Sequence, residues 1–258
     1  MTEVKTAVDN ELYSFTVDTE KEIEKQETKQ EGDEKITVTK KVKEVVPVRI
    51  VIKKPNRRLN DEAEMHRAVK MSQCIKEGIV TKAMLTKKYA DTGGVLSELE
   101  AKEYLSKYNR LMDLQVDWAK LSVTKKKEKG HAAKLKKLIG EMNTLRREVA
   151  NTESAHADIF NNTADVFALK QEILFYTLML SYIAEEDEEG NETLVPYFEG
   201  NTFSEKIDSY YEKEDNPSDF YIRVSTKLTY IITFWRNGAA MSKEDFEGVE
   251  KDIDEGNL

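Results

Sequence analysis

A chain of 258 residues is long enough to bury a substantial core, either as one large domain or as two smaller ones. Charged residues make up 34% of the chain and apolar residues 39%, which is typical of a soluble, surface-rich protein rather than a compact enzyme. The formal net charge of −9 argues against general nucleic-acid binding by the whole molecule, although a local basic patch could escape that average.

Cys74 is the single cysteine, so the sequence offers neither a disulfide framework nor a cysteine metal cluster, and it suits a reducing compartment. The first residues lack the apolar core of a signal peptide, and we therefore expect a protein that is not secreted. The longest apolar run, residues 173–184, is too short to span a bilayer and predicts a buried helix, so no membrane partner is expected.

Residues 1–55 predict an N-terminal β-hairpin module with a flexible start. Apolar and polar residues alternate on both sides of a turn signal at Gly32, which favours strands over roughly residues 12–23 and 34–52. Pro47 cannot donate to a strand ladder and therefore indicates an edge strand or a bulge.

The periodicity becomes helical after this module, and residues 56–96 predict short helices, the first of which ends at Gly78. Ser97 and Glu100 form an S-x-x-E capping box, which marks the start of a longer helix.

Two long helices, over residues 97–123 and 132–160, predict an antiparallel αα-hairpin rod that spans residues 97–160. Near its tip, Trp118 and Leu121 are expected to face the second arm. That arm repeats apolar residues at coiled-coil spacing, and this predicted seam comprises Leu135, Leu138, Met142, Leu145 and Val149.

Residues 161–258 predict a helical body whose centre is an apolar helix over residues 164–184. The acidic run 185–189 predicts a solvated loop. Capping signals start three further helices at Thr202, Ser218 and Ser242. The last of these helices is acidic, and we expect it to fray into an acidic tail. The predicted fold is mainly α, with a long coiled-coil-like αα-hairpin packed on a helical body and an N-terminal β-hairpin, and is α+β overall.

The sequence has few residues in patterns typical of catalysis or metal binding. His66, His131 and His156 have no partners at metal-ligand spacing, which favours structural or surface roles. The chain has no phosphate-binding glycine loop, nucleophile elbow or calcium-loop pattern. We therefore expect no enzyme, and we assign no catalytic, cofactor-binding or metal residues and no cofactor.

The tip of the predicted hairpin is the one feature with a plausible ligand. It gathers seven lysines, namely Lys125, Lys126, Lys127, Lys129, Lys134, Lys136 and Lys137. Phosphate backbones, an anionic lipid surface or an acidic partner could contact such a patch. The alternative is a solvated turn, because no aromatic residue interleaves the lysines as a base-stacking platform requires.

Four segments, together with the coiled αα-hairpin, resemble uncharacterised proteins of contractile-tailed (myovirus-type) bacteriophages from marine bacteria. These segments are Gly78–Tyr89, the Gly93–Gly94 break, Tyr197–Lys206 and Tyr210–Asp215, and the likeness covers roughly residues 48–250. The resemblance implies a virion component or tail-assembly factor that resides in the host cytoplasm during assembly, in the virion, or in both. It carries over no catalytic residue.

Two classes of function follow. In the first, the chain is a non-enzymatic structural or assembly protein, a bacteriophage virion or tail component or a tail assembly chaperone. It then binds other proteins of a phage particle, or further copies of itself, through the helical hairpin and the exposed edges of its N-terminal strands. In the second, it is an adaptor that binds nucleic acid or an anionic surface through the lysine-rich tip. The acidic net charge favours the first class.

Overall fold

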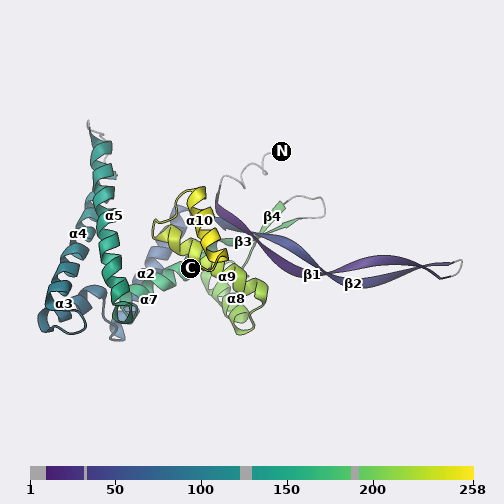
Figure 1. The fold of residues 1–258 in the computed structure, drawn as a ribbon, viewed down its shortest axis with the longest axis horizontal. Helices are drawn as coiled ribbons and strands as arrows, with labels where there is room; N and C mark the ends of the chain where they lie inside the picture. The colour runs from purple at the N-terminus through teal and green to yellow at the C-terminus, as the bar shows by residue number, and fades with distance from the viewer. Residues whose placement is uncertain (1–9, 32–33, 123–129, 187–191) are drawn as a thin grey trace. The chain divides into compact units, whose positions relative to one another are not determined.

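The computed structural model describes the backbone of residues 10–31, 34–122, 130–186 and 192–258, and the side chains of these residues except 21–42. The predicted fold class is confirmed, since the described chain is mainly helical and α+β overall, with a four-stranded antiparallel sheet (Figure 1). The elements are, in chain order, β1 (Glu11–Glu31), β2 (Glu34–Lys53), α2 (Arg57–Lys76), α3 (Lys82–Thr92), α4 (Glu98–Ser122), α5 (His131–Ala155), α6 (Ala157–Phe160), α7 (Ala164–Leu180), β3 (Ser181–Glu186), β4 (Glu192–Pro196), α8 (Phe203–Asp215), α9 (Asp219–Arg236) and α10 (Lys243–Asp254).

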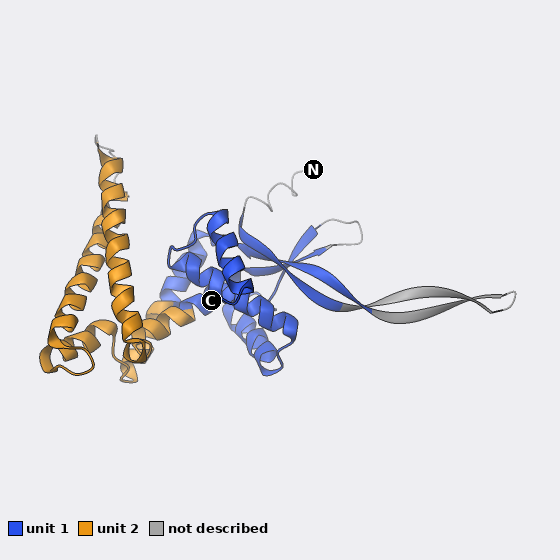
Figure 2. Cartoon of the chain, viewed as in Figure 1, with its two compact units in different colours: residues 1–66, 172–258 blue, residues 67–171 orange. Residues whose placement is uncertain are grey.

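The chain forms two compact units, shown in different colours in Figure 2. Unit 1 comprises residues 1–66 and 172–258, and unit 2 comprises residues 67–171, so unit 2 is an insertion within unit 1. Both crossings fall inside helices, because α2 and α7 each begin in one unit and end in the other.

This division differs from the four consecutive modules expected from the sequence, which were residues 1–55, 56–96, 97–160 and 161–258. The N-terminal strands are not a separate module. Their buried side chains belong to the same core cluster as those of the C-terminal helices, and such long-range packing leaves no mark on local periodicity.

The sheet of unit 1 has the strand order β1-β2-β3-β4. The predicted N-terminal hairpin is confirmed and is longer than expected, since β1 and β2 stay paired from Tyr13↔Ile52 to Glu31↔Glu34. β3 pairs with β2 through only three residue pairs, at Ile50, Val51 and Ile52.

The apolar segment expected to be one helix over residues 164–184 is a helix followed by a strand. α7 ends at Leu180, and the Ser181 hydroxyl donates to the Thr177 carbonyl oxygen at 2.6 Å, which satisfies an acceptor of the last turn. β3 then pairs with the edge of β2. Periodicity alone does not separate a buried strand from a buried helix, which explains the error.

The acidic run 185–189 is also not simply a loop. Glu185 and Glu186 complete β3, where they pair with Thr193 and Glu192 of β4, and residues 187–189 lie outside the described chain. The sequence of β4 shows no strong alternation of apolar and polar residues, so this strand was not predicted.

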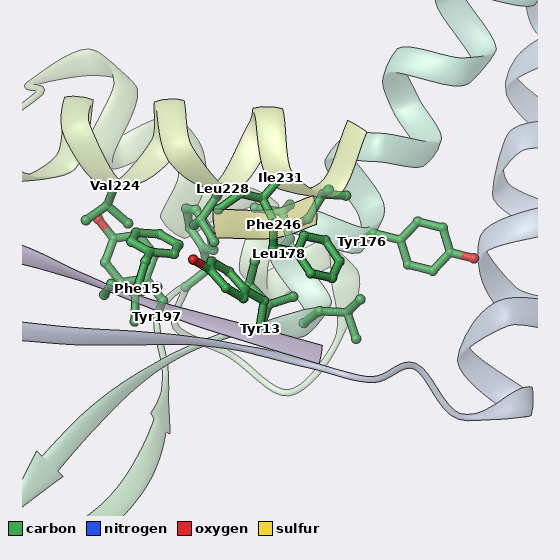
Figure 3. Packing of buried hydrophobic residues seen from close by; sticks show 14 of the residues in the cluster. Tyr13, Phe15, Tyr176, Leu178, Tyr197, Val224, Leu228, Ile231 and Phe246 are labelled. Carbon is green, nitrogen blue, oxygen red and sulfur yellow. The ribbon is translucent and has the colours of Figure 1, made fainter. Parts of the chain in front are cut away.

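The core of unit 1 lies between the sheet and the helices that cover one of its faces (Figure 3). Tyr13 and Phe15 of β1 meet Leu228 and Ile231 of α9, and all four side chains are buried. The ring of Tyr13 stacks on Phe246 of α10 with their centroids 5.1 Å apart. The base of the β-hairpin is therefore part of this core.

The C-terminal segment is a packed helix rather than the fraying acidic tail expected from its composition. In α10, Phe246 and Val249 are buried in the unit 1 core, while the acidic residues lie mainly on the exposed side. Two buried side chains one turn apart suffice to hold the helix on the core, although acidic residues dominate its composition.

Unit 2 contains the predicted helical hairpin, formed by α4 and α5. Contacts along it run in opposite directions in the two helices, which shows that they are antiparallel; the pairs are Arg110–Glu141, Lys107–Glu148 and Tyr104–Glu153. The second arm is shorter than the expected residues 132–160. Helical geometry breaks at His156, whose φ is −124°, and the short α6 follows.

The helix caps expected from the sequence are formed. Ser97 and Glu100 exchange side-chain and backbone hydrogen bonds at the start of α4, and Thr202 forms the equivalent capping box with Glu205 at α8. Ser218 and Ser242 cap the last two helices. No helix among those that the structure describes is both long enough and apolar enough to cross a lipid bilayer.

Candidate partner-binding surfaces

The paired strands β1 and β2, which we call the β1–β2 ribbon, extend well beyond the other two strands of the sheet. Ile50 is the last residue of β2 that pairs with β3. Beyond it, the pairing of β1 with β2 continues for 16 register pairs, from Thr16↔Arg49 to Glu31↔Glu34. At about 3.3 Å per residue this is roughly 50 Å of two-stranded ribbon. Along it no described residue forms a third strand, so both edges expose backbone donors and acceptors.

The base of the ribbon is fixed by polar contacts as well as by the core. The Tyr13 hydroxyl donates to Glu250 Oε2 at 2.6 Å, and Lys227 Nζ lies 2.9 Å from Glu250 Oε1 and 2.8 Å from Asp254 Oδ1. Arg223 donates to the carbonyl oxygen of Asp18 at 2.7 Å. The ribbon therefore leaves the body from a rigid base on α9 and α10.

These contacts shift two pKa values. Burial, followed by the hydrogen bond to Glu250, raises the pKa of the Tyr13 hydroxyl. Burial opposes the charge on Lys227, but its hydrogen bonds and attraction to Asp254 and Glu250 outweigh burial and raise the pKa of Lys227. Both groups hold their protons at physiological pH, so the polar anchor stays intact.

A groove opens where β3 stops pairing with β2. Its volume is about 670 Å³, and its lining residues are Val46, Pro47, Val48, Arg49, Ile183, Ala184, Glu185 and Glu192. The Arg49 guanidinium donates to Glu11 Oε2 at 2.6 Å and also to Glu192, so it links β1 with β4. Val45, next to the groove, is 62% exposed.

At three positions beyond Ile50 the register of the ribbon places residues of opposite charge across from one another, whereas at Lys25↔Lys40 and Glu31↔Glu34 it places residues of like charge there. Lys21 lies opposite Glu44, Glu22 opposite Lys43, and Glu24 opposite Lys41; the described Lys43 side chain also pairs diagonally with Glu20 at 3.1 Å. Cross-strand pairs of this kind favour one register over a slipped one.

The predicted seam residues of α5 lie on the side of the helix that meets α4. Met142 and Val149 are buried, and Leu135, Leu138 and Leu145 are partly buried. Leu138, Met142 and Leu145 form one cluster with Leu111 and Leu114 of α4.

Trp118 departs from the expected packing near the tip. Its side chain is 39% exposed, although it lies seven residues after the buried Leu111 and so shares its helical face. Neighbouring Val116 is 50% exposed.

The lysine cluster is only partly described. Lys134, Lys136 and Lys137 are exposed on the first turns of α5, whereas Lys125, Lys126, Lys127 and Lys129 lie outside the described residues. The arrangement of the seven lysines as one ligand-binding site therefore stays a prediction.

The histidines lie at three separate places. The His66 ring contacts the rings of Phe175 and Phe203, His131 is buried at the start of α5, and His156 ends that helix. In the described part of the chain, no group of three or more histidine, cysteine, aspartate or glutamate side chains is arranged to hold a metal ion.

Buried charged groups, which the sequence analysis did not single out, are used to join elements. Arg236 of α9 forms an ion pair of 2.7 Å with the fully buried Glu172 of α7, and the buried Lys206 of α8 donates to the Phe198 carbonyl oxygen at 2.7 Å. Burial lowers the pKa of Lys206. Their low exposure depends on tertiary packing, so no sequence signal could have found them.

No family model, no curated protein and no solved structure matches this chain.

Proposed function

We propose that this chain is a non-enzymatic assembly protein that binds another protein through the β1–β2 ribbon. The observation that carries the proposal is the ribbon itself, whose 16 register pairs beyond Ile50 gain no third strand from any described residue. Isolated two-stranded ribbons are marginal in water, and exposed strand edges act as templates for pairing with another chain. An arm of this length therefore gains most when a partner covers it.

The groove between β2 and β3 supports the same proposal. An extended segment of a partner that entered it would lie along the open edge of β2 beside the exposed Val45, with Glu185 and Glu192 at its other wall. Strand addition takes its affinity from backbone hydrogen bonds, and flanking side chains supply specificity.

The non-enzymatic part of the proposal is supported by the use of buried charge. Glu172 with Arg236, and Glu250 with Lys227, join helices to one another, and Lys206 holds a backbone carbonyl. Groups that an enzyme would direct at a substrate are here committed to holding the fold together.

The setting that we propose is a contractile-tailed bacteriophage, in which the chain would be a virion or tail component or a tail assembly chaperone. This part rests on the resemblance of residues 78–94 and 197–215 alone. It places the protein in the host cytoplasm during assembly, in the particle, or in both.

The second candidate is an adaptor for nucleic acid or an anionic surface, favoured by the exposed lysines of α5. Salt separates the two candidates. Phosphate contacts lose affinity steeply as salt rises, whereas a strand-addition complex changes little. A gel shift of duplex DNA by the full chain that disappears when Lys125, Lys126, Lys127 and Lys129 are replaced by Gln would favour the adaptor.

The test of the ribbon shortens it without disturbing its base. Lys21 and Glu44 are opposite in register, so residues 22–43 can be replaced by Asn-Gly, which closes a two-residue hairpin turn. We expect this variant to keep the helical circular dichroism signal and the thermal melting midpoint of the full chain but to lose the proteins that co-purify with the full chain from its native source. A matched control reverses the opposed pair Glu22 and Lys43 (Glu22→Lys with Lys43→Glu) and should retain them. The same partners at the same yield with the shortened ribbon would refute the proposal.

A further inference from the structure

Charge is segregated between the two units. Unit 2 contains 20 lysines and arginines against 13 aspartates and glutamates, a formal charge of +7, whereas unit 1 contains 20 against 36, a charge of −16. The net charge of −9 therefore conceals a basic insertion within an acidic body. Surfaces of opposite sign on one molecule are complementary to those on another copy.

The basic charge of α5 lies on the side away from its seam. At 100° per residue, the positions opposite the seam form one face, which we call the basic face and which comprises Lys136, Lys137, Gly140, Asn143, Thr144 and Arg147. All six residues are exposed. The nearest acids of α5, Glu141 and Glu148, lie beside this face and pair with Arg110 and Lys107 of α4.

The basic face is free to receive a partner. Among the described residues, Lys136, Lys137 and Arg147 form no ion pair, and a Cβ atom at Gly140 would meet no atom within 4 Å. Short neutral side chains separate the three charges, so another helix can approach the backbone closely. The face has no aromatic side chain on which a nucleic-acid base could stack.

A complementary face exists on α10 in unit 1. That helix carries six acids against two lysines, and its buried side is held in the core by Phe246 and Val249. Its outward side, which we call the acidic face, comprises the exposed residues Glu244, Glu247, Asp252 and Glu255. Two of these acids form exposed ion pairs within the helix, Glu247 with Lys243 at 3.6 Å and Glu255 with Lys251 at 3.7 Å, whereas Glu244 and Asp252 form no ion pair with any described residue. Both faces span 12 residues, or about 17 Å of helix.

We propose that the basic face of α5 in one copy binds the acidic face of α10 in a second copy. The contact is heterologous, since each copy presents one basic and one acidic face, and it leads to a ring or an open chain of copies. It is independent of the ribbon and of the partner that the ribbon binds. The self-association depends on salt because the paired charges remain near the surface.

The test compares the mass of the full chain by sedimentation equilibrium at about 0.1 M and about 1 M salt, where the Debye length falls from about 10 Å to about 3 Å. We expect association at low salt that is lost at high salt. The triple variant Lys136→Glu, Lys137→Glu, Arg147→Glu should raise the dissociation constant by about a hundredfold at low salt.

Two further variants make the result specific. Lys76→Glu, Lys87→Glu, Lys88→Glu changes the charge of unit 2 equally at exposed positions outside α5, and it should associate like the natural chain. Glu244→Lys, Glu247→Lys, Asp252→Lys should be monomeric alone, but it should associate when mixed with the α5 variant, because each reversed face then meets its opposite. A natural chain that stays monomeric at low salt refutes the proposal. So does a mixture that fails to associate, and so does duplex DNA that binds the basic face of a monomeric chain.

Discussion

Tyr104 is almost fully buried in unit 2, and its hydroxyl donates a hydrogen bond of 2.6 Å to Glu153 Oε1. Lys82 Nζ lies 2.7 Å from the other oxygen of the same carboxylate, so one glutamate joins α3, α4 and α5. Unit 1 repeats this arrangement with Tyr13, Glu250 and Lys227, which join β1, α10 and α9. In each unit a carboxylate between a tyrosine and a lysine fixes three elements that are distant in sequence.

Replacing Tyr104 by Phe removes one hydrogen bond to a charged acceptor and leaves the ring in place. Because such bonds contribute about 2 kcal/mol, we expect the unfolding free energy of unit 2 to fall by about that amount in urea titrations. Tyr211→Phe is a matched control, since Tyr211 is 56% exposed and its loss should change stability little. An unchanged midpoint in Tyr104→Phe would show that the hydroxyl contributes nothing net.

Tyr104 also makes the stability of unit 2 depend on pH. Burial, followed by the hydrogen bond to Glu153, raises the pKa of Tyr104 above its ordinary value. Above a pH of about 10 the unfolded chain releases this proton while the folded chain retains it, so the stability that Tyr104 provides is constant below about pH 10 and is lost as pH rises further. The stability difference between the natural chain and Tyr104→Phe should therefore shrink between about pH 9 and about pH 11. A difference that stays constant over this range would contradict the argument.

Among the elements, the seam of the α4–α5 hairpin gives the clearest test of packing. Leu138 and Leu145 contact the cluster of Leu111 and Leu114, so an aspartate at either position buries an unpaired charge. We expect Leu138→Asp or Leu145→Asp to unfold the hairpin, with a loss of at least about 3 kcal/mol, in thermal melts followed by circular dichroism. Thr144→Asp, on the exposed side of the same helix, is the control. Equal melting of seam and control variants would place the seam elsewhere.

Local signals in the sequence predicted the elements that depend on local chemistry. The capping boxes at Ser97 and Ser242, the turn at Gly78 and the apolar repeat of α5 each require only residues within a few positions of one another. The alternation of β1 and β2 was strong enough to predict their hairpin. Its full length was missed because Lys and Glu in the outer ribbon depress strand propensity.

Features that depend on distant residues were not predictable in the same way. β3 is a strand because β2 offers it an edge, and nothing within residues 181–186 distinguishes it from a further turn of α7. Likewise, the candidate partner-binding surfaces could be predicted from the sequence only in part. The ribbon edge and the exposed lysines of α5 follow from the sequence, but the groove beside Arg49 exists only where β2 and β3 diverge.

At the scale of the whole molecule, the insertion of unit 2 separates two sets of buried side chains. The core of unit 1 gathers residues from both ends of the chain, including Phe15 and Phe246, whereas the clusters of unit 2 lie within α3 to α6. The same division separates the charges, with the basic helices in the insertion and the acidic ones in the body. Each unit thus has its own interior and its own surface chemistry.

Separate cores predict separate responses to a core mutation. Phe246→Ala removes a ring that is 1% exposed and stacks on Tyr13, which should cost about 3–5 kcal/mol in unit 1. In amide hydrogen exchange measurements, we expect faster exchange in residues 13–17 of β1 and unchanged exchange in residues 104–114 of α4. The reason is that units with their own cores open with their own free energies. Leu145→Asp should give the mirror result. Equal acceleration in both segments by either variant would show instead that α2 and α7 couple the two units into one cooperative block.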